Sequence, residues 1–161
     1  MISRRRTLSL LGVLSIAFGA SGVAVAADTD QSKTAGGVTV YLGVVPAEIV
    51  KGLLASSSTE GPMHGRIPKG PHEYHIVAAV FDAVTGSRIS DAAVTAEVSG
   101  VGLSGDKRKL EPMQISGTTT YGGFFDLPGF DIYTVKLGVE HGVAGPAILQ
   151  FKYDHRRKPA G

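Results

Sequence analysis

Apolar and polar residues alternate most regularly over residues 133–139, YTVKLGV. A period of two over this length is typical of a β-strand with one buried face. A Pro128-Gly129 turn comes shortly before the run and separates it from the preceding apolar stretch. The buried face of this strand would carry only apolar side chains: Tyr133, Val135, Leu137 and Val139.

Similar short runs, rich in β-branched and aromatic residues, recur along the chain with turn residues between them. Residues 100–109 are expected to form a Gly-rich loop, and residues 46–51 fit either a short helical turn or a continued strand. No convincing amphipathic helix is present. The pattern predicts an all-β protein, an Ig-like antiparallel β-sandwich of about seven strands. The other expected strands cover residues 37–45, 73–81, 95–98, 110–115, 122–127 and 147–153.

Two local patterns support this fold. Tyr133 lies just inside its strand, where the tyrosine corner of Ig-like sandwiches places a phenol that bonds to nearby backbone. Asp82 begins the pattern D-x-x-T-G-x-x-I, which resembles the connection between two strands in many bacterial exported Ig-like domains. Both patterns indicate the fold and leave the activity open.

Residues 1–26 have the features of a secretory signal peptide: three arginines, an apolar stretch and a small-residue cleavage site. A transmembrane anchor is disfavoured because Gly and Ser interrupt the apolar stretch and no basic flank follows it. The arginines leave open whether export uses the general or the twin-arginine pathway. We therefore expect a periplasmic protein with a flexible lead-in at residues 27–36, the sandwich at 37–154 and a basic tail at 155–161.

Charge and cysteine content narrow the classes of function. The chain has 16 basic and 14 acidic residues, and removal of the leader, with three Arg and no acid, lowers the net charge from +2 to −1. This balance and a short tail without aromatic residues argue against nucleic-acid binding. The chain has no cysteine. Any metal site must therefore use His, Met, carboxylate or backbone donors.

Familiar enzyme signatures are missing from the sequence. It contains no nucleophile elbow, no Walker loop, no H-E-x-x-H and no dinucleotide-binding glycine pattern. We therefore predict that the protein is not an enzyme.

Histidine and methionine offer the clearest candidate chemistry. His64, His72 and His75 fall within twelve residues, and Met63 precedes the first of them. A mixed set of imidazole and thioether donors favours copper. His72 and His75 have an odd separation, so at most one of them can point into a given site on a strand. Each His alone also fits an ordinary hydrogen-bonded or exposed residue, and Met113 also fits core packing.

Residues 111–122, EPMQISGTTTYG, resemble the M-P-M-x-x-S-x-G-x-H-Y-G segment of the periplasmic iron-transport family. These Ig-like proteins bind copper and assist iron uptake beside a membrane permease. The resemblance implies that Met113 is a metal ligand. It also places His64 where the family has a His-containing loop, and His141 where the family has another ligand His. The motif positions at which this chain differs include Glu111, which replaces the first Met, and Thr120, which replaces the ligand His.

The sequence thus predicts an exported, non-enzymatic protein that binds copper and supports metal uptake with a membrane permease or another envelope protein. A homodimer is left open. The alternative is a metal-free Ig-like interaction module that docks on an envelope or membrane protein. A carbohydrate-binding role is disfavoured because the chain has no Trp. The predicted ligands are Met113, His64 and His141, with Met63, His72 and His75 in reserve.

Overall fold

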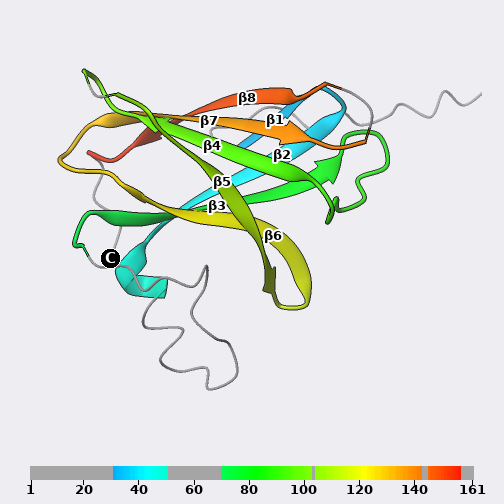
Figure 1. Cartoon of the computed structure of the whole chain (residues 1–161), viewed down its shortest axis with the longest axis horizontal. Coiled ribbons are helices and arrows are strands. Elements are labelled where there is room, and N and C mark those ends of the chain that lie inside the picture. Colours follow the sequence, from blue (N-terminus) through cyan, green and yellow to red (C-terminus); the bar gives the residue numbers. More distant parts are fainter. Residues whose placement is uncertain (1–30, 51–69, 103, 143–144, 157–161) are drawn as a thin grey trace, which may run out of the picture.

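Eight β-strands make up the protein in a computed structural model that describes residues 31–50, 70–102, 104–142 and 145–156 (Figure 1). Residues 47–50 form a helical turn, which settles the alternatives left open for this segment. Within the described ranges, no helix has the length and apolar character needed to cross a membrane. The strands are β1 (Ser32–Ala35), β2 (Val38–Pro46), β3 (Glu73–Asp82), β4 (Ala93–Ser99), β5 (Asp106–Ile115), β6 (Thr118–Asp126), β7 (Ile132–Glu140) and β8 (Ala147–Asp154).

The strands form two layers that are joined through β5. All pairs are antiparallel, in the order β1-β2-β3-β6-β5-β4-β7-β8. Residues 106–110 of β5 pair with β4, and residues 111–115 pair with β6. Figure 1 shows β5 crossing from one layer to the other. The predicted all-β antiparallel sandwich is confirmed, with eight strands in place of about seven.

The main core lies between the layers, and β7 shows the alternation that its sequence predicts. Tyr133, Val135, Leu137 and Val139 are at most 2% exposed, while Lys136 on the other face is exposed. They belong to one apolar cluster to which β3, β6 and β8 also contribute. Each large buried side chain contributes about 1.5–3 kcal/mol by leaving water. This core carries the stability of a chain that has no disulfide.

The tyrosine corner is confirmed. The Tyr133 hydroxyl donates a hydrogen bond to the backbone oxygen of Pro128, five residues upstream. The contact ties the start of β7 to the turn that follows β6. Asp82 organises the turn that follows β3. Its Oδ1 accepts hydrogen bonds from the backbone nitrogens of Val84 (3.0 Å) and Thr85 (2.7 Å).

Three boundaries differ from the sequence prediction. The expected flexible lead-in contains β1, because Gly36 and Gly37 both adopt positive φ and form a two-residue hairpin turn into β2. The expected loop at residues 100–109 ends earlier, because pairing with β4 extends β5 back to Asp106. His155, assigned to the tail, belongs to the folded part, since its ring nitrogen Nε2 lies 2.6 Å from the Tyr74 hydroxyl.

Replacing Tyr133 by Phe removes only the corner hydroxyl. We expect the free energy of unfolding to fall by about 1–2 kcal/mol, because the Pro128 oxygen loses its donor. Urea unfolding measures the change. The control is Tyr41→Phe, whose ring is 48% exposed and which should change stability by less than about 0.5 kcal/mol. Equal effects from the two variants would contradict a stabilising corner bond.

Candidate metal centre

The outer face of the β3 and β6 layer carries a second, smaller apolar cluster. Phe124 projects from this face of β6, since its neighbours Tyr121 and Phe125 belong to the main core. Ala47 and Val50 of the helical turn pack against Phe124. The outer face therefore has a dry patch of its own, and polar side chains beside it are in an unusual environment.

His75 is buried at the edge of this patch. Its neighbours in sequence along β3, Ile76 and Ala78, face the main core, so His75 points to the outer face. It lies opposite Phe124 in the strand register, and the two rings stack with centroids 4.7 Å apart. The side chain is only 2% exposed. A buried imidazole held flat against an aromatic ring has little freedom to move.

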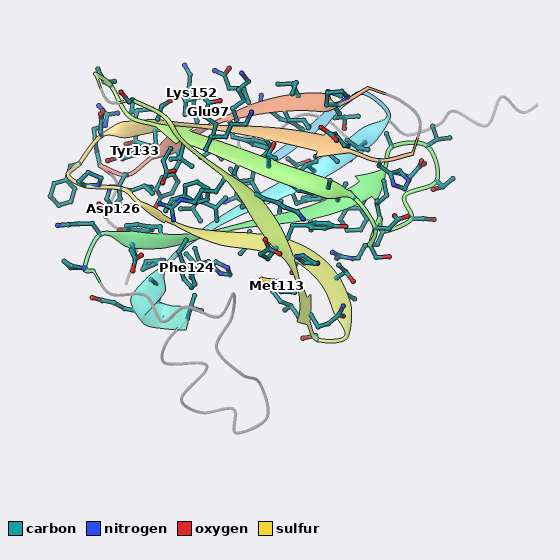
Figure 2. The ribbon with its side chains drawn as sticks, in the orientation of Figure 1. Glu97, Met113, Phe124, Asp126, Tyr133 and Lys152 are labelled. Atoms are coloured by element: carbon teal, nitrogen blue, oxygen red, sulfur yellow. The ribbon has the colours of Figure 1, made fainter. Side chains whose placement is uncertain are left out.

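Met113 reaches the same place from β5. The decisive residue is Gly122, whose missing side chain leaves room for both donors. A Cβ atom on Gly122 would lie 2.6 Å from His75 Nε2 and 2.8 Å from Met113 Sδ. The imidazole nitrogen and the thioether sulfur therefore share one small space above Gly122. Figure 2 shows Met113 on β5 and Phe124 on β6, both on the side away from the β4 and β7 layer.

Thr120 adds a third donor atom to this face. It lies directly opposite Met113 in the β5 and β6 register and two residues from Gly122. Cross-strand neighbours on one face have Cβ atoms about 4.5–5.5 Å apart. Thr120 is 7% exposed, and within the described residues its buried Oγ1 has no hydrogen-bond partner. Such an orphaned oxygen costs about 1–3 kcal/mol unless something binds it.

Tyr121 holds this part of β6 in place from the core side. Its hydroxyl accepts a hydrogen bond from the Ala92 nitrogen (2.9 Å) and donates one to the Ile89 oxygen (3.3 Å). Burial raises the pKa of Tyr121, so the phenol stays protonated and able to donate. Because Tyr121 lies between Thr120 and Gly122 and points into the core, these bonds keep both of its neighbours on the outer face of β6.

The structure brings together two of the six predicted ligands, Met113 and His75. His72 precedes β3 and is exposed. His141 follows β7 in the other layer, where its Nδ1 lies 3.3 Å from Asp91 Oδ1, and it is not among the residues nearest to the Gly122 position. Met113 lies on the part of β5 that pairs with β6, whereas His141 comes directly after the end of β7. Met63 and His64 lie outside the described residues.

His75 is predicted from the sequence only as a reserve ligand, and Gly122 enters the prediction only as the last residue of the segment 111–122. A signal for His75 was present, because it is the one strongly polar side chain inside the apolar run of residues 74–81. Within the described ranges, no three His, Cys, Asp or Glu side chains cluster as a metal site. The candidate centre therefore depends on the softer donor Met113 and on the hydroxyl of Thr120.

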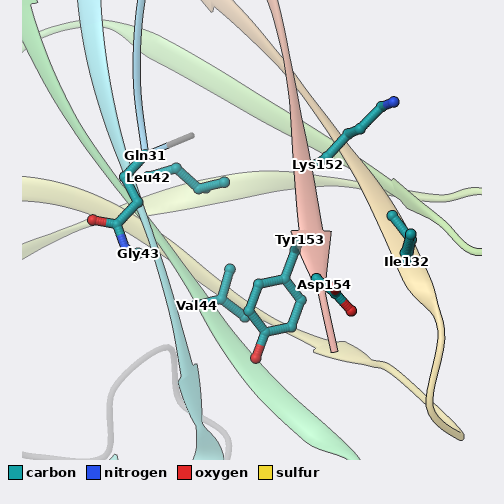
Figure 3. A pocket seen from close by; sticks show the side chains of 8 residues that line it. All are labelled: Gln31, Leu42, Gly43, Val44, Ile132, Lys152, Tyr153 and Asp154. Carbon is teal, nitrogen blue, oxygen red and sulfur yellow. The ribbon is translucent and has the colours of Figure 1, made fainter. Parts of the chain in front are cut away.

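A separate pocket lies at the seam between β2 and β8 (Figure 3). β2 pairs with β1 only as far as Tyr41, with one further bond from the Leu42 nitrogen to the Gln31 oxygen (2.8 Å). From Gly43 onward, no described strand pairs with the edge of β2 that faces away from β3. Among the described strands, β8 pairs with β7 alone. The pocket between the two edges is lined by Gln31, Leu42, Gly43, Val44, Ile132, Lys152, Tyr153 and Asp154.

Comparison with known proteins shows likeness at the level of the fold. No protein-family profile and no curated protein matches the chain. Three of the solved structures that match have TM-scores of 0.54 to 0.56 over 76–77% of this chain and 91–92% of theirs. They are a copper-bound variant of FetP from uropathogenic Escherichia coli (12% identity), copper-reconstituted P19 from Campylobacter jejuni (11%) and a DUF4426 family protein from Pseudomonas aeruginosa (16%).

Replacing Gly122 by Ala tests the shared space directly. The added methyl meets Nε2 of the buried, stacked His75, so we expect a loss of about 1–3 kcal/mol in the free energy of unfolding. The matched control is Gly43→Ala, whose Cβ would meet Val77 at an ordinary 3.8 Å. Urea unfolding compares the two, and a Gly122→Ala protein as stable as the control would show that the space is not tightly framed.

Proposed function

We propose that this protein is an exported copper-binding protein whose metal site lies over Gly122, between His75 and Met113. One observation carries the proposal: an imidazole nitrogen and a thioether sulfur lie at 2.6 and 2.8 Å from the same point, where a side chain is missing. The resemblance of residues 111–122 to a copper-binding segment supports it. The fold likeness to copper-bound FetP and P19 supports it as well.

The residues present fit a copper ion. Thioether and imidazole are both donors that copper accepts, and the combination is unusual for zinc, calcium or magnesium. Thr120 brings a buried hydroxyl oxygen that lacks a hydrogen-bond partner among the described residues. His75 and Met113 would hold the ion, and the stacked ring of Phe124 would keep the imidazole in position. Bound copper would be a soft Lewis acid that these donors capture and release.

The biological role follows from the predicted export. A periplasmic protein with a small buried copper site is suited to capturing metal and passing it to a membrane permease or another envelope protein, without catalysis. Imidazole binds metal only through a deprotonated nitrogen, so acidification should weaken binding at His75. The roles of the predicted ligands Met63 and His64 remain predictions, because these residues lie outside the described ranges.

Copper titration of the purified mature protein tests the site. We expect His75→Ala and Met113→Leu each to weaken copper affinity at least about tenfold, which is about 1.4 kcal/mol. His72→Ala and His141→Ala remove imidazoles that lie away from Gly122 and should leave affinity unchanged. Competition with a chromophoric chelator measures the affinities. Millimolar binding, or an equal loss in the His141 variant, would refute the site.

A second function is favoured by the seam between β2 and β8. Two strand edges without a further partner among the described strands flank a pocket with apolar residues at Leu42, Val44 and Ile132. An exposed edge can bind an extended segment by β-augmentation. The corresponding proposal is a metal-independent docking module for an extended segment of an envelope protein.

A single introduced thiol can distinguish this role, because the chain has no cysteine of its own. With Val44→Cys we expect thiol cross-linking to one envelope protein in the periplasm, in the presence of a copper chelator. The control is Val84→Cys, at a site that is 77% exposed and away from the seam. Mass spectrometry identifies the cross-linked protein. Equal cross-linking from both positions would count against docking at the seam.

A further inference from the structure

We propose that the His75 and Met113 site selects copper(I) over copper(II). The inference rests on the proposed copper-binding function and names the oxidation state that the site accepts. Three features support this selectivity: the donor atoms around Gly122, the low ionic charge that the apolar surroundings favour, and the exposed position of Glu111, which lies opposite Gly122 in the strand register.

The donor set is small, and one of its members is a soft thioether. Thioether sulfur selects copper(I), whereas copper(II) prefers nitrogen and oxygen donors in a tetragonal arrangement. Around Gly122 the described residues supply one imidazole, one thioether and the neutral hydroxyl of Thr120. A neutral hydroxyl is a weak donor for copper(II). One soft thioether beside a single imidazole therefore satisfies a copper(I) ion better than a copper(II) ion, which needs more nitrogen or oxygen donors.

The surroundings favour the lower charge. His75 is 2% exposed and stacks on Phe124, which packs against Ala47 and Val50. Moving an ion from water into such a region costs free energy that grows with the square of its charge, so a divalent ion pays far more than a monovalent one. An anionic ligand could offset this cost, but neither His75 nor Met113 provides one.

Glu111 is the carboxylate to consider, because it lies opposite Gly122 in the register and on the same face as Met113. Its side chain is exposed, and the atoms nearest to the Gly122 position belong to His75 and Met113. In its exposed position the carboxylate remains hydrated and does not neutralise the buried site. Glu111 therefore has no role in holding the ion.

The first test compares the two oxidation states on the purified mature protein. Copper(I) is titrated under anaerobic reducing conditions and copper(II) in air, each against a competing chelator, and silver(I) serves as a redox-inert monovalent probe. We expect copper(I) to bind at least about 100-fold more tightly than copper(II), with silver(I) also bound. Copper(II) binding of equal or greater strength overturns the inference while leaving the copper function intact. Failure of both copper ions to bind overturns both.

The second test adds a nitrogen donor. Thr120→His places a second imidazole opposite Met113, and we expect copper(II) affinity to rise at least about tenfold. Thr118→His adds the same side chain two residues away at an exposed position and should have no effect. If copper(II) binding is unchanged by Thr120→His in a folded protein, or depends on Glu111 as shown by Glu111→Gln, the inference is wrong.

A third variant keeps the inference testable if Thr120→His does not fold. Met113→His exchanges the thioether for an imidazole at a half-buried position. We expect it to lose silver(I) and copper(I) affinity and to gain copper(II) affinity. Retention of the original preference for copper(I) would show that Met113 does not set the selectivity.

Discussion

Burial of both faces of β6 is the constraint on which the rest of this structure depends. Tyr121 and Phe125 face the core between the layers, while Thr120 and Phe124 face a second covered surface. A strand buried on both sides cannot shift its register without moving one apolar set into the wrong environment. The hairpin with β5 and the pairing with β3 are therefore held in one alignment.

That alignment also creates the candidate site. His75, Met113 and Gly122 belong to three adjacent strands, so their relative positions follow from the backbone ladder and not from a loop. The site has a cost, because Gly122 adds no packing and Thr120 leaves a buried oxygen without a described partner. Local compromises of this kind are expected where a protein exchanges stability for function.

The site and the seam lie on different strands of the sandwich. The site uses β3, β6 and β5, whereas the seam pocket lies between β2 and β8. The two surfaces could therefore act independently. The tyrosine corner of Tyr133 stabilises the start of β7. Ile132, the residue before it, lines the seam pocket, so the corner also helps to hold one wall of that pocket in place.

Local patterns in the sequence determined the strand class, the buried face of β7 and the corner at Tyr133, because period-two alternation and turn residues act over a few positions. Met113 became a candidate ligand through the resemblance of residues 111–122 to a copper-binding segment. The partner of Met113 was decided by tertiary structure. Alternation says which face His75 takes but not which strand lies beside it, and chain order does not reveal that His141 lies in the other layer. The role of Gly122 was likewise decided by tertiary structure, because the space left by its missing side chain is bounded by His75 and Met113 from the two neighbouring strands.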